Sequence, residues 1–469
     1  MVFSSISFLI YFLPLLMAVY FSVPARFRRA RNFILLAASL VFYGWGGPKL
    51  VLLLVLSCAV YYFCGLMAGQ TRFAWLKKAG LIGACVIGLG LLGWYKYAGF
   101  FAGIINSIGI HVPVPEVVLP IGISFFTFQG LSYVIDVYRG TVPVQKNPLC
   151  TALYVAMFPQ VMSGPIIRYS VIADKITQRS ENLESVTSGL VRFAFGLSKK
   201  MLLANAVGKI ADAAFSKGAA SLTASMAWLG AIAYTLQIYF DFSSYSDMAI
   251  GIARVFGFVF PENFNYPYIA KSITEFWRRW HISLSAWFRD YVYIPLGGNR
   301  CSKWKNIRNL AAVWLLTGLW HGSNWTFVLW GVWFLLLLMG EKFVWGKWME
   351  KRPKIVRHVY TLLAVMFSWV LFRSDNIGGA VKYVGAMFGA GASGSFGETF
   401  YYLRMYWLQL IACVIASAPV KCAAEKWLAE RRDSPVWSAV YQWAPKICAL
   451  ILLAVSYVKL VTGSFNPFI

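Results

Sequence analysis

Apolar stretches long enough to cross a lipid bilayer recur along the whole chain, separated by short polar or basic segments. Several runs are shorter than the roughly 20 residues that a straight span needs, which indicates re-entrant or interfacial helices as well. The pattern predicts an all-α integral membrane protein with about ten to twelve transmembrane helices. The predicted runs are Phe3–Val23, Asn32–Tyr43, Leu50–Met67, Ala79–Tyr97, Val117–Val137, Cys150–Gly164, Gly189–Ala206, Ala227–Ile252, Asn309–Met339, Val359–Phe372, Trp407–Pro419 and Ala449–Val461.

Composition supports the membrane assignment independently of the pattern. Hydrophobic residues make up 59% of the 469 residues, only 13% are charged, and the mean hydropathy is +0.62. A soluble domain carries about 45–50% apolar and about 25% charged residues. These values exclude a soluble, a disordered and a fibrous chain. No separate soluble domain and no internal repeat is evident, so residues 1–469 are predicted to form a single polytopic membrane domain.

The charge balance is strongly basic, with 43 Lys and Arg against 18 Asp and Glu, a formal net charge of +25. The basic residues cluster between apolar runs, which is typical of cytoplasmic loops and of contact with anionic lipids rather than with nucleic acid. Because Arg26–Arg31 directly follows the first run, that loop is predicted to be cytoplasmic and the N-terminus to be outside. The other clusters are Arg72–Lys78, Arg168–Arg179, Lys271–Arg308, Lys342–Arg357 and Lys421–Arg432.

The segment from Ile273 to Tyr291 has a helical periodicity unlike that of a spanning helix. Its apolar side chains recur at positions i, i+3, i+4 and i+7, and arginines fall toward the other side. A Trp- and Arg-rich helix of this kind is expected to lie in the headgroup plane, as an interfacial anchor or as part of a site. Pro295, Gly297 and Gly298 are expected to end it in a turn.

Two of the four histidines, His281 and His321, lie in apolar, Trp-rich surroundings. An ionisable residue at membrane depth is costly and usually faces a cavity, a pathway or a partner. If Trp314–Trp333 forms one helix, His321 shares a face with Thr317 and Asn324, which could orient its ring. The residue types favour a general base; a buried structural histidine is the alternative.

Other chemistry is sparsely represented in the sequence. No nucleophile elbow, phosphate-binding loop, zinc-binding HExxH or cysteine pair of metal-ligand spacing is present, so no resident metal is expected. Asp241 and Asp247 stand inside an apolar run beside Ser244, where they either line a polar path or cap a broken helix.

Four sequence blocks together resemble the membrane-bound O-acyltransferase family, in its bacterial polysaccharide-modifying branch. They are FPQVMSGPIIRY at Phe158–Tyr169, YFDFSSYSDMAIGIARVFGF at Tyr239–Phe258, the segment Asn263–Gly298 containing WRRWH, and LTGLWHGSNWTFVLWG at Leu316–Gly331. The resemblance implies a ring of helices around a central tunnel, with residues 158–331 as the catalytic core. It also implies that His321 is essential and that His281 is implicated, chemically or structurally. The residues expected to support them or to line the substrate path are Asn324, Trp320, Asp241 and Ser244.

The function implied by this resemblance is transfer of an acetyl or other short acyl group to hydroxyls of an extracellular polysaccharide such as alginate or bacterial cellulose. It implies an acyl thioester donor, acetyl-CoA or an acyl-carrier protein, on the cytoplasmic side, and no permanently bound cofactor. It further implies a location in the bacterial inner membrane and a periplasmic partner of the SGNH-hydrolase type. A transporter or flippase of a polymer or a lipid-linked intermediate is the alternative, as is a scaffold that would not need His321.

Overall fold

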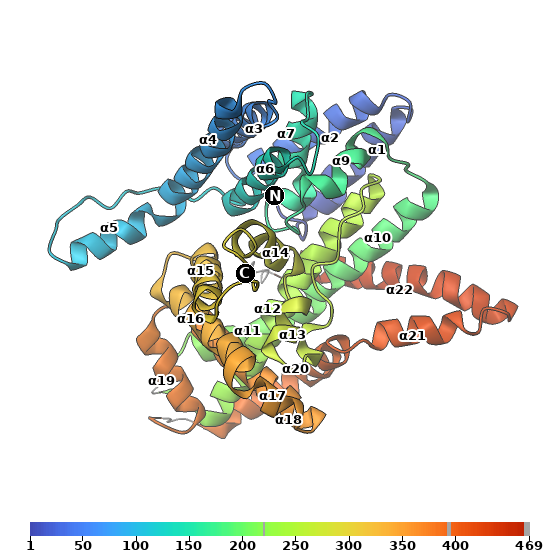
Figure 1. Cartoon of the computed structure of the whole chain (residues 1–469). Helices are drawn as coiled ribbons and strands as arrows, with labels where there is room; N and C mark the ends of the chain where they lie inside the picture. Colours follow the sequence, from blue (N-terminus) through green and yellow to red (C-terminus); the bar gives the residue numbers. More distant parts are fainter. Residues whose placement is uncertain (219–220, 392–394, 464–469) are drawn as a thin grey trace. The chain divides into compact units, whose positions relative to one another are not determined.

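The computed structural model describes residues 1–218, 221–391 and 395–463. These residues form helices joined by turns and loops, with no strand among them, which confirms the all-α prediction. The chain divides into two compact units (Figure 1). Unit 1 comprises residues 1–193 and 248–261, and unit 2 comprises residues 194–247 and 262–469.

Unit 1 holds the N-terminal helices. Helices α3 and α4 pack side by side, α6 packs against both, and α2 and α3 pack against α7. The helices are the π-helix η1 (Ser7–Phe12), α1 (Leu13–Ser22), α2 (Arg28–Gly44), α3 (Pro48–Ala68), α4 (Ala74–Leu92), η2 (Gly93–Tyr97), α5 (Ala98–Ser107), α6 (Ile123–Arg139), α7 (Pro148–Ala156), α8 (Phe158–Val161), α9 (Tyr169–Thr177) and α10 (Leu183–Ser198), whose last residues belong to unit 2.

Unit 2 holds the remaining helices, apart from the last turns of α12, which belong to unit 1. Helices α15 and α16 form an adjacent pair, and α13 packs on α16 and α18. The helices are η3 (Lys199–Ala204), α11 (Asn205–Phe215), α12 (Ala224–Val255), η5 (Pro267–Ile269), α13 (Ile273–Arg279), α14 (Ile282–Phe288), η6 (Arg289–Tyr293), α15 (Lys303–His321), α16 (Trp325–Gly340), η7 (Glu341–Trp345), α17 (Gly346–Glu350), α18 (Lys354–Arg373), α19 (Ile377–Met387), α20 (Phe396–Ala416), α21 (Val420–Ala429) and α22 (Pro435–Thr462).

Six helices of the described chain are long and apolar enough to cross a membrane, so the predicted count of ten to twelve is not confirmed. A shorter apolar helix, Ser7–Ser22, comes from the first predicted run. The six are Pro48–Ala68, Ala74–Ser107, Trp325–Glu350, Lys354–Arg373, Phe396–Ala416 and Pro435–Thr462.

Two predicted runs are broken into separate helices. Cys150–Gly164 ends its first helix at Ala156, because Pro159 cannot continue a helix and is accommodated in the first turn of α8. Asn309–Met339 is interrupted after His321, where Gly322 and Asn324 adopt extended backbone angles. The apolar runs therefore indicated that these segments are apolar and packed, but not where their helices end.

A buried ion-pair group ties α2 to the segment before α10. The Glu181 side chain is 1% exposed and pairs with Arg28, with Arg31 at 3.0 Å and with Arg179 at 3.3 Å. Burial alone would raise the pKa of Glu181. Hydrogen bonds from Arg28 and Tyr20, together with the nearby positive charges, instead lower that pKa below its ordinary value.

Candidate active site

The predicted interfacial helix Ile273–Tyr291 is not continuous in the structure. Helix α13 ends at Arg279, and α14 begins at Ile282, because His281 adopts a left-handed backbone conformation with φ of 43°. This conformation is uncommon outside glycine and is a mark of functional or strained positions. Trp277, Trp280 and His281 are buried within unit 2 rather than spread along a surface. The prediction of one continuous helix is therefore wrong for this segment, whose aromatic side chains pack inside unit 2.

A buried hydrogen-bond network surrounds His281. The Asn263 side-chain oxygen lies 3.2 Å from His281 Nδ1 and accepts from the Ser283 N–H at 3.1 Å and from the Ser283 hydroxyl at 2.9 Å. Asn263 Nδ2 donates to the Ser246 hydroxyl of α12 at 3.2 Å. The network joins α12, the loop before η5 and the break between α13 and α14.

His281 itself is fully enclosed, with no exposed surface. Phe242 packs edge-on against its ring at 4.6 Å and Trp320 at 5.7 Å between ring centroids. His281 lies outside the six candidate spans, and burial lowers its pKa to about 3 because the charged ring would lose its hydration. The ring is therefore neutral at physiological pH.

His321 is the last residue of α15 and is only half-buried. Three aromatic rings stand edge-on to its imidazole: Trp320 at 4.9 Å, Trp330 of α16 at 4.9 Å and Phe372 of α18 at 5.2 Å. His321 thus combines an apolar surround with a side chain that a reactant can reach.

Trp320 contacts both histidines. Its buried indole packs edge-on against His281 at 5.7 Å and against His321 at 4.9 Å between ring centroids. The structure therefore places both predicted histidines and the predicted Trp320 in one cluster within unit 2.

Asn324 does not share a helical face with His321, because the helix ends between them. Its side-chain oxygen instead accepts from the Thr326 N–H at 3.2 Å and caps α16. Its amide nitrogen donates to the Asp375 carbonyl at 2.8 Å. Both ends of this amide are occupied by structural contacts.

Asp241 and Ser244 lie in the middle of the unbroken helix α12, so capping of a broken helix is not their role. Asp241 is 4% exposed and pairs at 2.5 Å with the equally buried Lys200 of η3. Asp247 pairs with the neighbouring Lys199. The Ser244 hydroxyl donates to the Asp241 backbone carbonyl at 2.7 Å.

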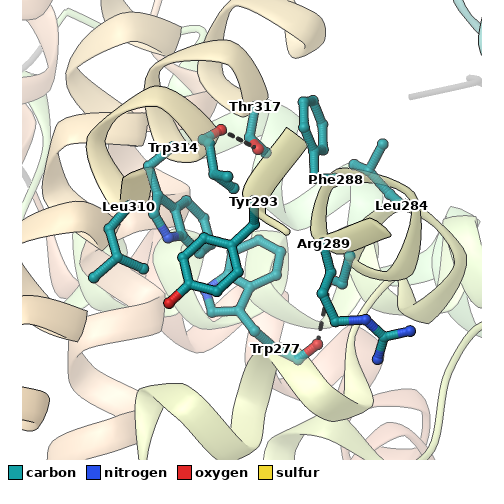
Figure 2. A pocket seen from close by; sticks show the side chains of 10 residues that line it. Trp277, Leu284, Phe288, Arg289, Tyr293, Leu310, Trp314 and Thr317 are labelled. Carbon is teal, nitrogen blue, oxygen red and sulfur yellow. Dashed lines mark hydrogen bonds between the residues drawn. The ribbon is translucent and has the colours of Figure 1, made fainter. Parts of the chain in front are cut away.

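An apolar pocket of about 170 Å³ lies between the α13–η6 segment and α15 (Figure 2). Two of its hydroxyls, on Ser285 and Thr317, already donate to the backbone carbonyls of Trp277 and Val313. The lining therefore suits hydrocarbon better than a phosphate. The lining residues are Trp277, Leu284, Ser285, Phe288, Arg289, Tyr293, Leu310, Val313, Trp314 and Thr317.

Two partners of the predicted residues, Asn263 and Lys200, carry no signal of their role in the sequence. Asn263 stands at the start of the third resembling block, but neither periodicity nor residue type marks it as the partner of a histidine 18 positions away. Lys200 follows Lys199, and such a basic pair is typical of an ordinary helix end. Pairing residues so distant in sequence requires the tertiary structure.

Comparison with known proteins shows the family. The description "MBOAT, membrane-bound O-acyltransferase family" matches residues 141–377, which include His281 and His321. The chain belongs to the membrane-bound O-acyltransferase family. It is therefore an acyltransferase, and family membership decides against the transporter and scaffold alternatives.

Individual family members match over most of their length. The chain is 40% identical to "Probable alginate O-acetylase AlgI" of Azotobacter vinelandii, covering 100% of this chain and 99% of that protein. It is 44% identical to the protein of the same name from Pseudomonas syringae pv. tomato, covering 83% and 76%. It is 36% identical to "Peptidoglycan O-acetyltransferase" of Helicobacter pylori, covering 83% and 80%.

Proposed function

We propose that this acyltransferase moves an acetyl or other short acyl group onto hydroxyls of an extracellular or periplasmic polysaccharide, with His321 as the general base. The observation that carries the proposal is the position of His321, half-buried at the end of α15 among three aromatic rings. The names of the relatives, which refer to alginate and peptidoglycan, support a polysaccharide acceptor. Alginate and bacterial cellulose are the acceptors that we would test first.

The proposed reaction is direct acyl transfer from a thioester. The imidazole of His321 takes the proton of the acceptor hydroxyl while the hydroxyl oxygen attacks the thioester carbonyl carbon. A carbon–oxygen bond forms, the carbon–sulfur bond breaks, and the departing thiolate receives the proton from His321. No resident cofactor is required by this sequence of steps.

The fully enclosed His281 is less suited than His321 to exchange a proton with a large acceptor. Asn324 is also poorly suited to stabilise the oxyanion that develops during attack, because its amide caps α16 and holds the Asp375 carbonyl. Backbone N–H groups of the α15–α16 turn, at the positive end of the α16 dipole, are the better candidates.

The donor in this proposal is acetyl-CoA or an acyl-carrier protein on the cytoplasmic side of the bacterial inner membrane, with the N-terminus outside. The basic segment Lys271–Arg308 could receive the phosphates of such a donor, and binding of anionic lipids accounts for its charge equally well. Passage of the acyl group through a central tunnel, to the polysaccharide directly or by way of a periplasmic SGNH-type partner, completes the proposal.

The first experiment is to measure the O-acetyl content of exported polysaccharide in cells that carry His321→Ala at the membrane abundance of the wild type. His111→Ala is the matched control, because His111 is an exposed histidine. Loss of acetyl groups with normal polymer export is expected for His321→Ala alone. Unchanged acetylation in His321→Ala would overturn the assignment of His321 as the base.

A further inference from the structure

The contact between Asn263 and His281 determines which ring nitrogen of His281 carries a hydrogen. The Asn263 atom that faces His281 also receives the Ser283 backbone N–H at 3.1 Å. A backbone N–H can only donate, so this atom is the amide oxygen, which has no hydrogen to give. His281 Nδ1 must therefore be the donor in the 3.2 Å contact.

The amide of Asn263 is fixed at both ends and cannot turn over. The side-chain nitrogen of Asn263 donates to the Ser246 hydroxyl on α12 at 3.2 Å. The backbone carbonyl of Asn263 also accepts from the Ile282 N–H at 3.0 Å, which holds the residue in place. Asn263 is completely buried, so water does not compete for these bonds. The direction of the His281 contact is therefore built into the fold.

The opposite nitrogen of the His281 ring is left as a hydrogen-bond acceptor. A neutral imidazole with its hydrogen on Nδ1 carries a lone pair on Nε2. This Nε2 atom is buried and has no hydrogen-bond partner in the part of the chain that the structure describes. Such an unmet group costs about 1–3 kcal/mol, so its retention beside Trp320 and His321 points to a ligand.

We propose that Asn263 is a positioning residue for acyl transfer, which holds His281 in the Nδ1–H tautomer so that Nε2 accepts a hydrogen bond from an O–H or N–H group of a reactant. An oxyanion requires a donor, so this arrangement excludes a neutral His281 from oxyanion stabilisation. The activity test rests on the proposed function, because it measures polysaccharide O-acetylation; the tautomer of His281 does not.

The activity test compares Asn263→Leu with Asn265→Leu at matched membrane abundance. Asn265 is the matched control, because it lies two residues away and is exposed. Asn263→Leu is expected to lower polysaccharide O-acetylation about 10- to 100-fold, as loss of a partner that orients a histidine does elsewhere. Asn263→Asp keeps an acceptor oxygen and is expected to retain at least tenfold more acetylation than Asn263→Leu. Equal acetylation in Asn263→Leu and wild type would overturn the proposal.

A spectroscopic test reads the wild-type protein directly and does not depend on activity. In ¹⁵N-histidine-labelled wild-type protein in detergent, the signals absent from His281→Gln should show a protonated Nδ1 and an unprotonated Nε2. A protonated Nε2 would overturn the tautomer assignment. Failure of His321→Ala to reduce acetylation would instead contradict the proposed function and leave this spectrum unchanged.

Discussion

Gly318 of α15 and Gly331 of α16 face each other where the two helices pack. A methyl carbon placed on either glycine would lie 3.4 Å from the Cα atom of the other, and 2.4 Å from a backbone carbonyl oxygen. Small residues permit such close approach of two helices. The position of His321 at the end of α15 therefore depends on glycine at both positions, because any side chain there would push the two helices apart.

Gly318→Ala should disturb the active site without altering its chemistry. The added methyl must push the α16 backbone at Phe327, which shifts the turn after His321. Because a displacement of about 1 Å can cost about 100-fold in rate, we expect at least a tenfold loss of acetylation. Gly90→Ala in α4 meets nothing within 4 Å and should leave acetylation at the wild-type level. Normal acetylation in Gly318→Ala would show that the helix pair tolerates separation.

Asn324 substitutions separate a capping role from a catalytic one. Asn324→Ala should lower stability by about 0.5–2 kcal/mol through loss of the α16 cap, and Asn324→Asp should keep the cap. We expect Asn324→Asp to retain acetylation within about tenfold of wild type, since losing an oxyanion donor would cost about 100- to 1,000-fold. Thermal unfolding in detergent and polymer O-acetyl content are the two measurements. A loss of the larger size in Asn324→Asp would restore Asn324 as an oxyanion donor.

Breaking the Lys200–Asp241 pair should lower stability strongly, whereas replacing both residues by apolar ones should lower it little. Removing one partner leaves a buried charge, so Lys200→Met should cost about 3–5 kcal/mol and reduce membrane abundance. The double variant Lys200→Met with Asp241→Leu should recover most of that loss, because an apolar pair needs no compensation. Melting temperatures of the purified variants measure both effects. A double variant as unstable as the single one would argue against a purely structural pair.

Glu181→Gln should destabilise unit 1. The substitution removes the negative charge that three arginines share and leaves two of them, Arg31 and Arg179, buried without it, at an expected cost of about 3–5 kcal/mol. Glu184 is exposed near the start of α10, so Glu184→Gln is the matched control and should melt like the wild type. Melting of purified protein at neutral pH makes the comparison.

The same carboxylate should make the protein sensitive to acid. Because the pKa of Glu181 is lowered in the folded state, its contribution is fully present above the unfolded value of about 4.3. That contribution is lost as the pH falls from there through the folded pKa. Wild type and Glu184→Gln should therefore lose melting temperature in this window more steeply than Glu181→Gln. Parallel pH curves for all three proteins would count against the assignment.

The sequence by itself determined the membrane class, the helical fold and the candidate histidines. Composition and run length decide the first two. A chain with 59% hydrophobic residues needs a bilayer, and backbone buried in lipid must form its own hydrogen bonds. His281 and His321 could be found because an ionisable side chain among tryptophans can be recognised from the sequence alone. The resemblance carried by the WRRWH and WHG blocks then indicated the family that the comparisons show.

Only the tertiary structure decided where the helices break and what each side chain contacts. Helical periodicity assumes a continuous helix, so it could not place the left-handed turn at His281 or the end of α15 at His321. The partners of the site residues, Asn263 for His281 and Lys200 for Asp241, are 18 and 41 positions away in the sequence. No local pattern encodes such pairings, because packing of whole helices brings the side chains together.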